Sequence, residues 1–193
     1  ASIEGAHYAY NYIRKLDFKS GQRVMLNGAT GAIGNAALQI MKSMGIHVIA
    51  TCPGNKFDLI QSLGAEKTID YQKEDFTQLK EEFDFVFDSV GKSRFSACKK
   101  NLKPGGIYIS SELGPGSENL YLPTTTAIFA KKKVKFPVPG DIPATLNFIS
   151  DLLRKGQFKP LIDNKVGFDE LKESFEYVNS GKKTGNLILN PWA

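Results

Sequence analysis

Residues 23–34 read RVMLNGATGAIG, a short apolar strand followed at once by a glycine-rich turn. Apolar side chains then recur at helical spacing until Gly45, which ends the predicted helix. Gly31 lets a pyrophosphate approach the backbone, and Gly34 lets the helix pack closely on the strand. The free N–H groups and the positive dipole end of the helix face the same point. This stretch therefore predicts a dinucleotide site, although Ala29 replaces the first glycine of the usual Gly-x-Gly-x-x-Gly pattern.

The rest of the chain alternates between strands and helices. The predicted strands are residues 23–27, 47–51, 68–69, 84–88, 107–111 and, at an edge, 134–138. The predicted helices are residues 33–44, 56–63, 75–80, 93–101 and 146–153. Strands that are apolar throughout, rather than alternating, are typical of a parallel sheet covered on both faces. The expected fold is α/β, a Rossmann-type doubly wound parallel sheet of about six strands.

A glycine-rich turn can also be required only for the backbone conformation between a strand and a helix. Other nucleotide-binding folds contain such a turn as well. None of the seven tyrosines begins the Tyr-x-x-x-Lys motif of short-chain dehydrogenases. Asn27 stands where methyltransferases usually carry an acidic residue, and no Gly-Lys-Ser/Thr sequence follows the turn as a Walker loop requires. The strand before the turn, the helix after it and a second strand ending about 20 residues later favour dinucleotide binding.

The composition is that of an ordinary soluble globular protein, with 41% hydrophobic and 23% charged residues. The cysteines, Cys52 and Cys98, form no Cys-x-x-Cys pair, so neither a disulfide framework nor a zinc ribbon is expected. With His7 and His47 also scattered, we expect no bound zinc. No apolar run or leader suggests a membrane span or secretion, so the expected location is the cytoplasm.

The net charge of +5, from 25 Lys and Arg against 20 Asp and Glu, favours an anionic ligand. The densest basic run, residues 131–133, has no aromatic interleaving, so we interpret it as a solvated helix end. We expect neither a nucleic acid nor a membrane as partner.

The last stretch of the chain has a different pattern. Apolar residues at helical spacing run from Phe168 to Val178, and a final strand covers residues 186–190. We therefore divide the chain into a dinucleotide-binding domain, residues 1–157, and a C-terminal segment, residues 158–193.

Six motifs together resemble the zinc-independent, quinone oxidoreductase-like branch of the medium-chain dehydrogenase/reductase superfamily, which includes NAD(P)-dependent alcohol dehydrogenases. Besides the turn at residues 27–34, they are LGA with IDY (63–65, 69–71), FDSVG (87–91), LKPGG (102–106), KPLI (159–162) and SG…TGNLI (180–188). The likeness covers nearly the whole chain. Asn186 departs from it, because the family often has lysine there.

The resemblance implies hydride transfer between a nicotinamide cofactor and a small carbonyl, alcohol, quinone or enone substrate. It implies that Thr30, Gly31, Ala32 and Ile33 hold the pyrophosphate. Ser89 and Val90 would lie beside the nicotinamide ribose, and Ser110 and Ser111 would face the carboxamide, unless they are ordinary loop hydroxyls. No catalytic residue is assigned, since a lone histidine such as His7 at a helix start is more often structural.

The loop after the second strand predicts a preference for NADP(H) over NAD(H). NAD-selecting enzymes usually place an acid at the end of this strand, and none stands here. Thr51 and Asn55 can donate hydrogen bonds to a 2′-phosphate, and Lys56 can supply charge, unless it is merely solvated. By family likeness, Tyr71 would come close to the same phosphate.

The resemblance also implies that an N-terminal catalytic domain precedes this stretch, which opens at Ala1 rather than Met. Residues from about Phe158 onward would pack on that domain, and we expect them to expose apolar surface without it. Relatives often dimerise through sheet edges, so residues 134–138 are a candidate homodimer edge, although Pro137 and Pro139 each remove a donor.

Two alternatives remain open. The chain could be a non-catalytic dinucleotide-binding module that senses redox state or holds a partner, or a basic nucleic-acid binder. Turnover of a nicotinamide cofactor by the full-length protein separates an enzyme from such a module. Steep salt dependence of nucleic-acid binding would indicate the third function.

Overall fold

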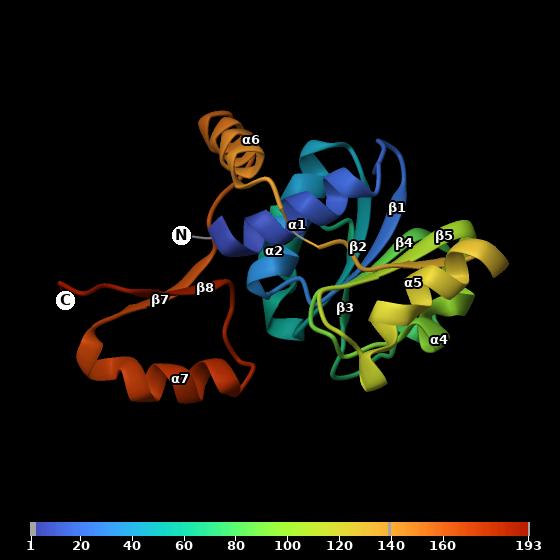
Figure 1. The fold of residues 1–193 in the computed structure, drawn as a ribbon. Helices are drawn as coiled ribbons and strands as arrows, with labels where there is room; N and C mark the ends of the chain where they lie inside the picture. Colours follow the sequence, from blue (N-terminus) through green and yellow to red (C-terminus); the bar gives the residue numbers. More distant parts are fainter. Residues whose placement is uncertain (1–2, 139, 193) are drawn as a thin grey trace.

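The computed structural model describes residues 3–138 and 140–192, so Ala1 and Pro139 lie outside it. The strands are β1 (Arg23–Asn27), β2 (His47–Cys52), β3 (Lys67–Asp70), β4 (Phe83–Asp88), β5 (Leu102–Ser110), β6 (Lys133–Lys135), β7 (Ile162–Val166) and β8 (Asn186–Leu189). The α-helices are α1 (Ile3–Lys15), α2 (Ala32–Ser43), α3 (Phe57–Leu63), α4 (Phe95–Cys98), α5 (Glu118–Phe129), α6 (Ile142–Arg154) and α7 (Leu171–Asn179) (Figure 1). No helix among the described residues is long and apolar enough to cross a membrane.

The first six strands form one parallel sheet in the order β3-β2-β1-β4-β5-β6. From β1 the chain builds outward first on one side, through β2 and β3, and then on the other, through β4 to β6. The carboxyl ends of β1 and β4 therefore flank the point where the winding reverses, which is where ligands of such sheets bind. The predicted Rossmann-type doubly wound sheet is confirmed.

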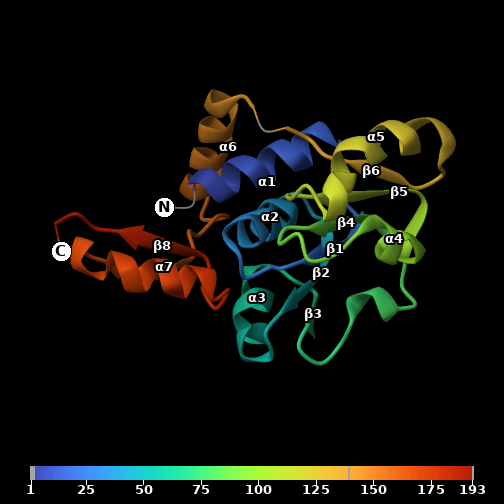
Figure 2. The same cartoon turned by 60° about the horizontal axis from the view of Figure 1, so that its bottom comes forward.

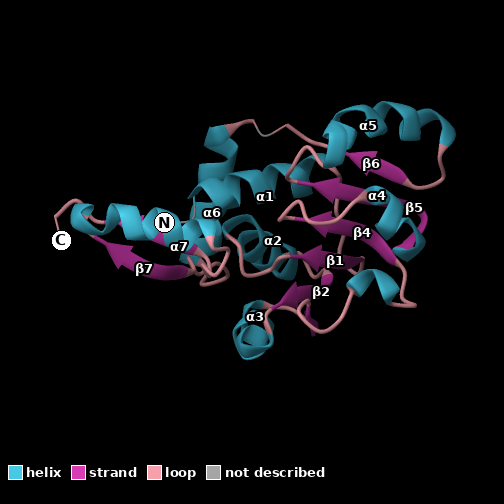
Figure 3. Ribbon diagram, turned by 90° about the horizontal axis from the view of Figure 1, so that it is seen from below, coloured by secondary structure: helices cyan, strands magenta, loops and turns pink. Residues whose placement is uncertain are grey.

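Helices cover both faces of this sheet, as Figure 3 shows for α1 and α2 on one side and α4 and α5 on the other. On the first face, α1, α2 and α3 pack against alternate strand residues such as Leu26 and Phe87, which are fully buried. Helix α6 packs on α1, where the rings of Phe148 and Tyr10 stack. On the second face, α4 and α5 cover Met25 and Tyr108. Burial on both faces explains why the strands are apolar throughout.

Several elements differ from the sequence-based expectation. The helix expected at residues 75–80 is only a 3₁₀ turn, Phe76–Gln78, and the one expected at 93–101 is the short α4 followed by another 3₁₀ turn. Helix α5 was not predicted, because Pro123 lies inside it and a Gly/Pro-containing stretch precedes it. Packing against β5 and β6 forms this helix despite weak local propensity.

The edge strand β6 has three residues and ends at Lys135, two residues short of Pro137. Within the described residues, β6 pairs with β5 on one side only. Val138, which the sequence placed in this strand, lies beyond it and is 70% exposed. Pairing of this edge with a second copy stays a prediction.

Residues 162–192, the C-terminal arm, extend away from the rest of the molecule (Figures 1 and 2). In the arm, β7 and β8 pair in parallel, and α7 connects them. Phe158 differs from the expectation of exposure, because it is buried in the core of the first domain. The next residue is fixed there too, since the Gln39 side chain bonds both the N–H and the carbonyl of Lys159. The exposed apolar surface begins only at Ile162.

Candidate functional site

The glycine-rich turn after β1 is tightly enclosed. Gly28 has φ +93°, and a Cβ there would lie 2.4 Å from Val90 Cγ1. A Cβ on Gly34 would lie 2.0 Å from the Gly28 carbonyl oxygen, so α2 can approach the turn only with glycine at this position. The position filled by Ala29 is buried and needs no glycine. The tight turn that the usual pattern assigns to its first glycine is made here one residue earlier, by Gly28.

Helix α2 begins directly after this turn, and its N-terminus is open. Gly31 is the N-cap, and no side chain caps the first turn of the helix. A Cβ on Gly31 would meet nothing nearer than the Gly28 carbonyl at 3.6 Å, so the space in front of it is free. Thr30, Ala32 and Ile33 are partly exposed around it. An open helix N-terminus beside a glycine suits a phosphate group.

Thr51 lies inside the site rather than on its surface. Its hydroxyl donates to Asn27 Oδ1 at 2.7 Å and accepts from the Gly28 N–H at 2.8 Å. The side chain is fully buried, and both of its bonds hold the glycine turn. The geometry therefore does not support the expected phosphate contact, which stays a prediction, and assigns Thr51 to shaping the turn.

Asp88, at the end of β4, organises the neighbouring strand ends. It is fully buried, and its carboxylate accepts from five donors. These are Asn27 Nδ2, the N–H groups of Val90, Gly91 and Ser93, and the Tyr108 hydroxyl. The sequence placed Asp88 at the end of a predicted strand and in a family motif, and assigned it no role. The density of donors explains how a buried carboxylate is tolerated here.

Ser89 and Val90 follow this carboxylate. The Ser89 hydroxyl donates to the Asn27 carbonyl at 2.8 Å, so it fastens the loop after β4 to the glycine turn. Val90 is 39% exposed, and its side chain touches the space that a Cβ on Gly28 would occupy. Both residues therefore lie against the turn, and their expected place beside the nicotinamide ribose stays a prediction.

Ser110 and Ser111 end β5 differently from each other. Ser110 is buried, and its hydroxyl accepts from the Glu112 N–H at 3.1 Å. The Ser111 hydroxyl is buried and has no hydrogen-bond partner within the described part of the chain. A buried hydroxyl without a partner is costly, so Ser111 suits a polar ligand group arriving at the carboxyl end of β5.

A basic cleft of about 750 Å³ opens beside the glycine turn. It brings together four predicted site residues from three loops, Thr30, Asn55, Lys56 and Tyr71. It is also lined by residues that sequence reasoning did not assign, among them Lys73, Lys92, Lys182, Lys183 and Asp70. Lys182 and Lys183 lie within the SG…TGNLI motif, and two adjacent lysines there were the feature of the sequence that could have predicted their place in the cleft. The cleft falls within the roughly 300–1,000 Å³ range of small-molecule sites.

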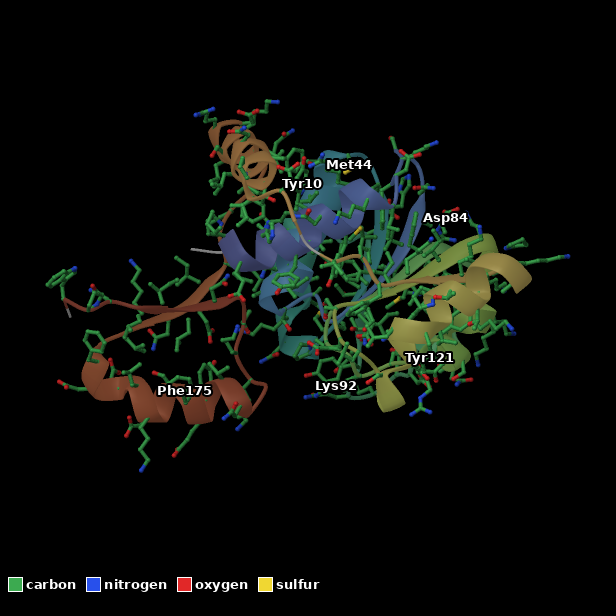
Figure 4. The ribbon with its side chains drawn as sticks, viewed as in Figure 1. Tyr10, Met44, Asp84, Lys92, Tyr121 and Phe175 are labelled. Atoms are coloured by element: carbon green, nitrogen blue, oxygen red, sulfur yellow. The ribbon has the colours of Figure 1, made fainter. Side chains whose placement is uncertain are left out.

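The charges of this cleft are largely uncompensated. Lys73 lies 3.8 Å from Asp70, the carboxylate at the end of β3. No ion pair is made by the other lysines of the cleft with any residue the structure describes. These are Lys56, Lys92 (labelled in Figure 4), Lys182 and Lys183. Several unpaired ammonium groups around one hollow favour a ligand with multiple negative charges.

The two histidines lie in structural settings. The His7 ring lies 2.9 Å from the Thr145 hydroxyl, and the bond links α1 to α6. His47 contacts Glu66 at the surface. Among residues 3–138 and 140–192 no group of three or more His, Cys, Asp or Glu side chains could hold a metal ion. The His, Cys, Asp and Glu side chains of the described residues therefore do not by themselves form a zinc site. Zinc independence of the protein stays a prediction.

Comparison with known proteins places these features in context. Residues 63–189 match the protein family described as zinc-binding dehydrogenase. A 2-methylene-furan-3-one reductase from Solanum lycopersicum is 30% identical over 190 residues, which are 95% of this chain and 44% of the reductase. The mitochondrial NAD(P)H oxidoreductase RTN4IP1 of Mus musculus is 30% identical over 194 residues, covering 88% of this chain and 48% of that protein. The chain spans about half the length of these curated relatives.

A similar relation holds for solved structures. The structure of the quinone oxidoreductase from Coxiella burnetii matches with a TM-score of 0.84 at 21% identity, over 96% of this chain and 57% of that one. At this identity the likeness is evidence of the fold.

Proposed function

The chain belongs to the zinc-binding dehydrogenase family of the medium-chain dehydrogenase/reductase superfamily, and from this premise we propose that it binds NADP(H) for an oxidoreductase. The observation that carries the proposal is the basic cleft at the carboxyl ends of the parallel strands. Five loops meet there, and their lysines leave several positive charges unpaired. When bound, the cofactor supplies hydride transfer.

Each part of the site has a distinct task in this proposal. The turn at Thr30–Ile33 binds the pyrophosphate through backbone N–H groups at the start of α2. Thr51 and Asp88 keep that turn and the end of β4 rigid through the bonds described above. Ser111 offers its unpartnered hydroxyl to the nicotinamide carboxamide. The protein thus fixes the cofactor along one line of strand ends.

The preference for NADP(H) rests on charge. A 2′-phosphate adds about 1.5 to 2 negative charges to the ligand. Lys56 lines the cleft beside Asn55 and Tyr71, and has no acidic partner among the described residues. Asp70 faces the same cleft, but Lys73 lies against it. The local balance therefore favours an additional phosphate over a bare ribose hydroxyl.

The activity of the whole protein is a further step of the proposal. One relative is named a furanone reductase and another an NAD(P)H oxidoreductase. By likeness, the substrate here is a small carbonyl, alcohol, quinone or enone, and the C-terminal arm packs on a separate catalytic domain. A cytoplasmic location stays a prediction, since one of these relatives is named mitochondrial.

Lys56→Ala tests the cofactor assignment. A charge-assisted contact is worth about 1.5–3 kcal/mol, so NADP(H) affinity should fall about tenfold or more. Affinity for NAD(H) should barely change, because Lys56 would contact only the 2′-phosphate. Calorimetric titration of both cofactors measures this difference, with Lys172→Ala on the exposed side of α7 as the matched charge control.

Two results would count against the proposal. Equal losses for the two cofactors, or no loss for NADP(H), would mean that Lys56 does not contact the 2′-phosphate. Binding of cofactor without any turnover by the full-length protein would instead favour the non-catalytic module.

A further inference from the structure

The loop between α7 and β8, residues 180–185, forms one wall of the basic cleft although it belongs to the C-terminal arm. Ser180 through Thr184 line the cleft opposite residues of the loops after β2 and β3. The cleft is therefore bounded both by the C-terminal arm and by the loops of the parallel sheet. Figure 2 shows this arm extending away from the sheet. A ligand in the cleft touches both.

This loop is attached to the glycine turn at one point. The Gly185 N–H donates to the Thr30 carbonyl at 2.7 Å. Gly185 has φ +78°, and a Cβ there would lie 2.3 Å from the Leu161 carbonyl oxygen. Only glycine fits this close approach, so the attachment depends on the backbone rather than on a side chain. It sets Lys183, two residues earlier, in the same cleft as Thr30 of the glycine turn.

Lys183 carries a charge that the protein itself does not neutralise. Its ammonium group is half-buried and donates to the Gly185 carbonyl. Burial lowers the pKa of Lys183, although the carboxylate of Asp163 acts in the opposite direction. Asp163 accepts a hydrogen bond from the Tyr177 hydroxyl at 2.6 Å, and forms no ion pair with Lys183. A partly desolvated cation is stabilised by an anion placed next to it.

We propose that Lys183 is a phosphate-binding positioning residue, and that a nucleotide phosphate held between it and the turn at Thr30 fastens the C-terminal arm to the nucleotide-binding domain. This inference rests on the proposed function and adds a consequence to it. The phosphate strengthens an attachment that otherwise depends on the Gly185–Thr30 bond and the packing of residues 158–161. Because coupling is reciprocal, an arm held in place also raises the affinity for the phosphate.

The first experiment measures hydrogen exchange of the 193-residue chain alone and with NADP⁺, NAD⁺ or inorganic pyrophosphate. We expect each ligand to slow exchange of the amides at 185–189 about tenfold, equivalent to about 1.4 kcal/mol. Lys183→Met should remove this protection and lower the affinity for NADP⁺ and NAD⁺ by similar factors. Lys183→Arg should restore both, and Lys172→Met serves as the control with the same loss of charge on the arm.

The outcomes separate this inference from the function on which it rests. Unchanged protection and affinity in Lys183→Met would overturn the role of Lys183, while leaving cofactor binding intact. Failure of the wild-type chain to bind either dinucleotide would overturn the proposed function. Protection by pyrophosphate that disappears in Lys183→Met would still support the phosphate site in that case. If protection persists in Lys183→Met but disappears in Lys56→Ala, the proposed role of Lys183 is overturned, because Lys56 would be the residue that fastens the arm.

Discussion

The nucleotide-binding domain and the C-terminal arm contain the same kinds of apolar residue but bury them very differently. In the domain, Phe87 is fully buried between β1 and β5, and its ring contacts Tyr12 of α1. In the arm, Phe175 on α7 is 66% exposed (Figure 4), and Trp192 is 91% exposed. A six-stranded sheet covered on both faces encloses its own core. Two strands and one helix have only one inner face.

This difference separates two sources of stability. The domain buries apolar area within itself, whereas the arm is held through its base and, in our proposal, through a phosphate. Where large exposed apolar side chains such as these gather into a patch, they commonly mark a surface for another protein or domain. The arm therefore contributes to the ligand site while adding little to the stability of the domain.

The largest expected effect contrasts the two phenylalanines. Phe87→Ala should lower the free energy of unfolding by about 3–5 kcal/mol, since it leaves a cavity in a closed core. Phe175→Ala should change it by about 0.5 kcal/mol or less, because the side chain is mostly in water already. Urea unfolding followed by circular dichroism measures both. A comparable loss in the two variants would mean that the arm shares the core of the domain.

An intermediate effect separates shape from ligand contact within the glycine turn. Gly34→Ala should lower the free energy of unfolding by about 1–3 kcal/mol, because its Cβ would overlap the Gly28 carbonyl. Gly31→Ala should leave stability unchanged, since φ −70° suits alanine and the space is open. Its methyl group would instead block the pyrophosphate and lower dinucleotide affinity about tenfold.

Thermal unfolding and cofactor titration of these two variants distinguish the roles. If Gly31→Ala binds the dinucleotide as tightly as wild type, the phosphate does not lie in front of this residue. If Gly34→Ala unfolds normally, the close approach of α2 to the turn is not needed for stability.

The smallest expected effect concerns the two cysteines, which should not react with disulfide reagents in the folded protein. Burial raises the pKa of Cys52 and of Cys98 to about 11 each, so both thiols are protonated at pH 8. The thiolate is the reactive form, and its fraction grows only as the pH approaches the raised pKa. Neither cysteine should react with a disulfide reagent until the domain unfolds, even where the arm has detached. Rapid labelling in native buffer at pH 8 would contradict this burial.

Much of the fold could be predicted because its signals are local. The glycine turn between an apolar strand and an amphipathic helix, and the runs of apolar strand residues, indicate a doubly wound sheet from short windows of sequence. Residues 118–129 were the main failure, because Pro123 and nearby glycines are poor helix signals and packing on β5 decided the outcome. The edge strand β6 was predicted too long, because its pairing with β5 ends at Lys135, before Pro137.

What the sequence determined by itself was the chemistry of the site: a glycine turn for phosphate, no acid after β2, and an excess of positive charge. Only the tertiary structure decided which side chains share that site. Thr51 is adjacent to the ligand loop in sequence, yet its hydroxyl is turned inward by Asn27 and Gly28. Lys183 is far along the chain, yet the Gly185–Thr30 bond brings it to the same cleft. The physical reason is that strand order and loop convergence depend on packing between distant segments, which no local pattern contains.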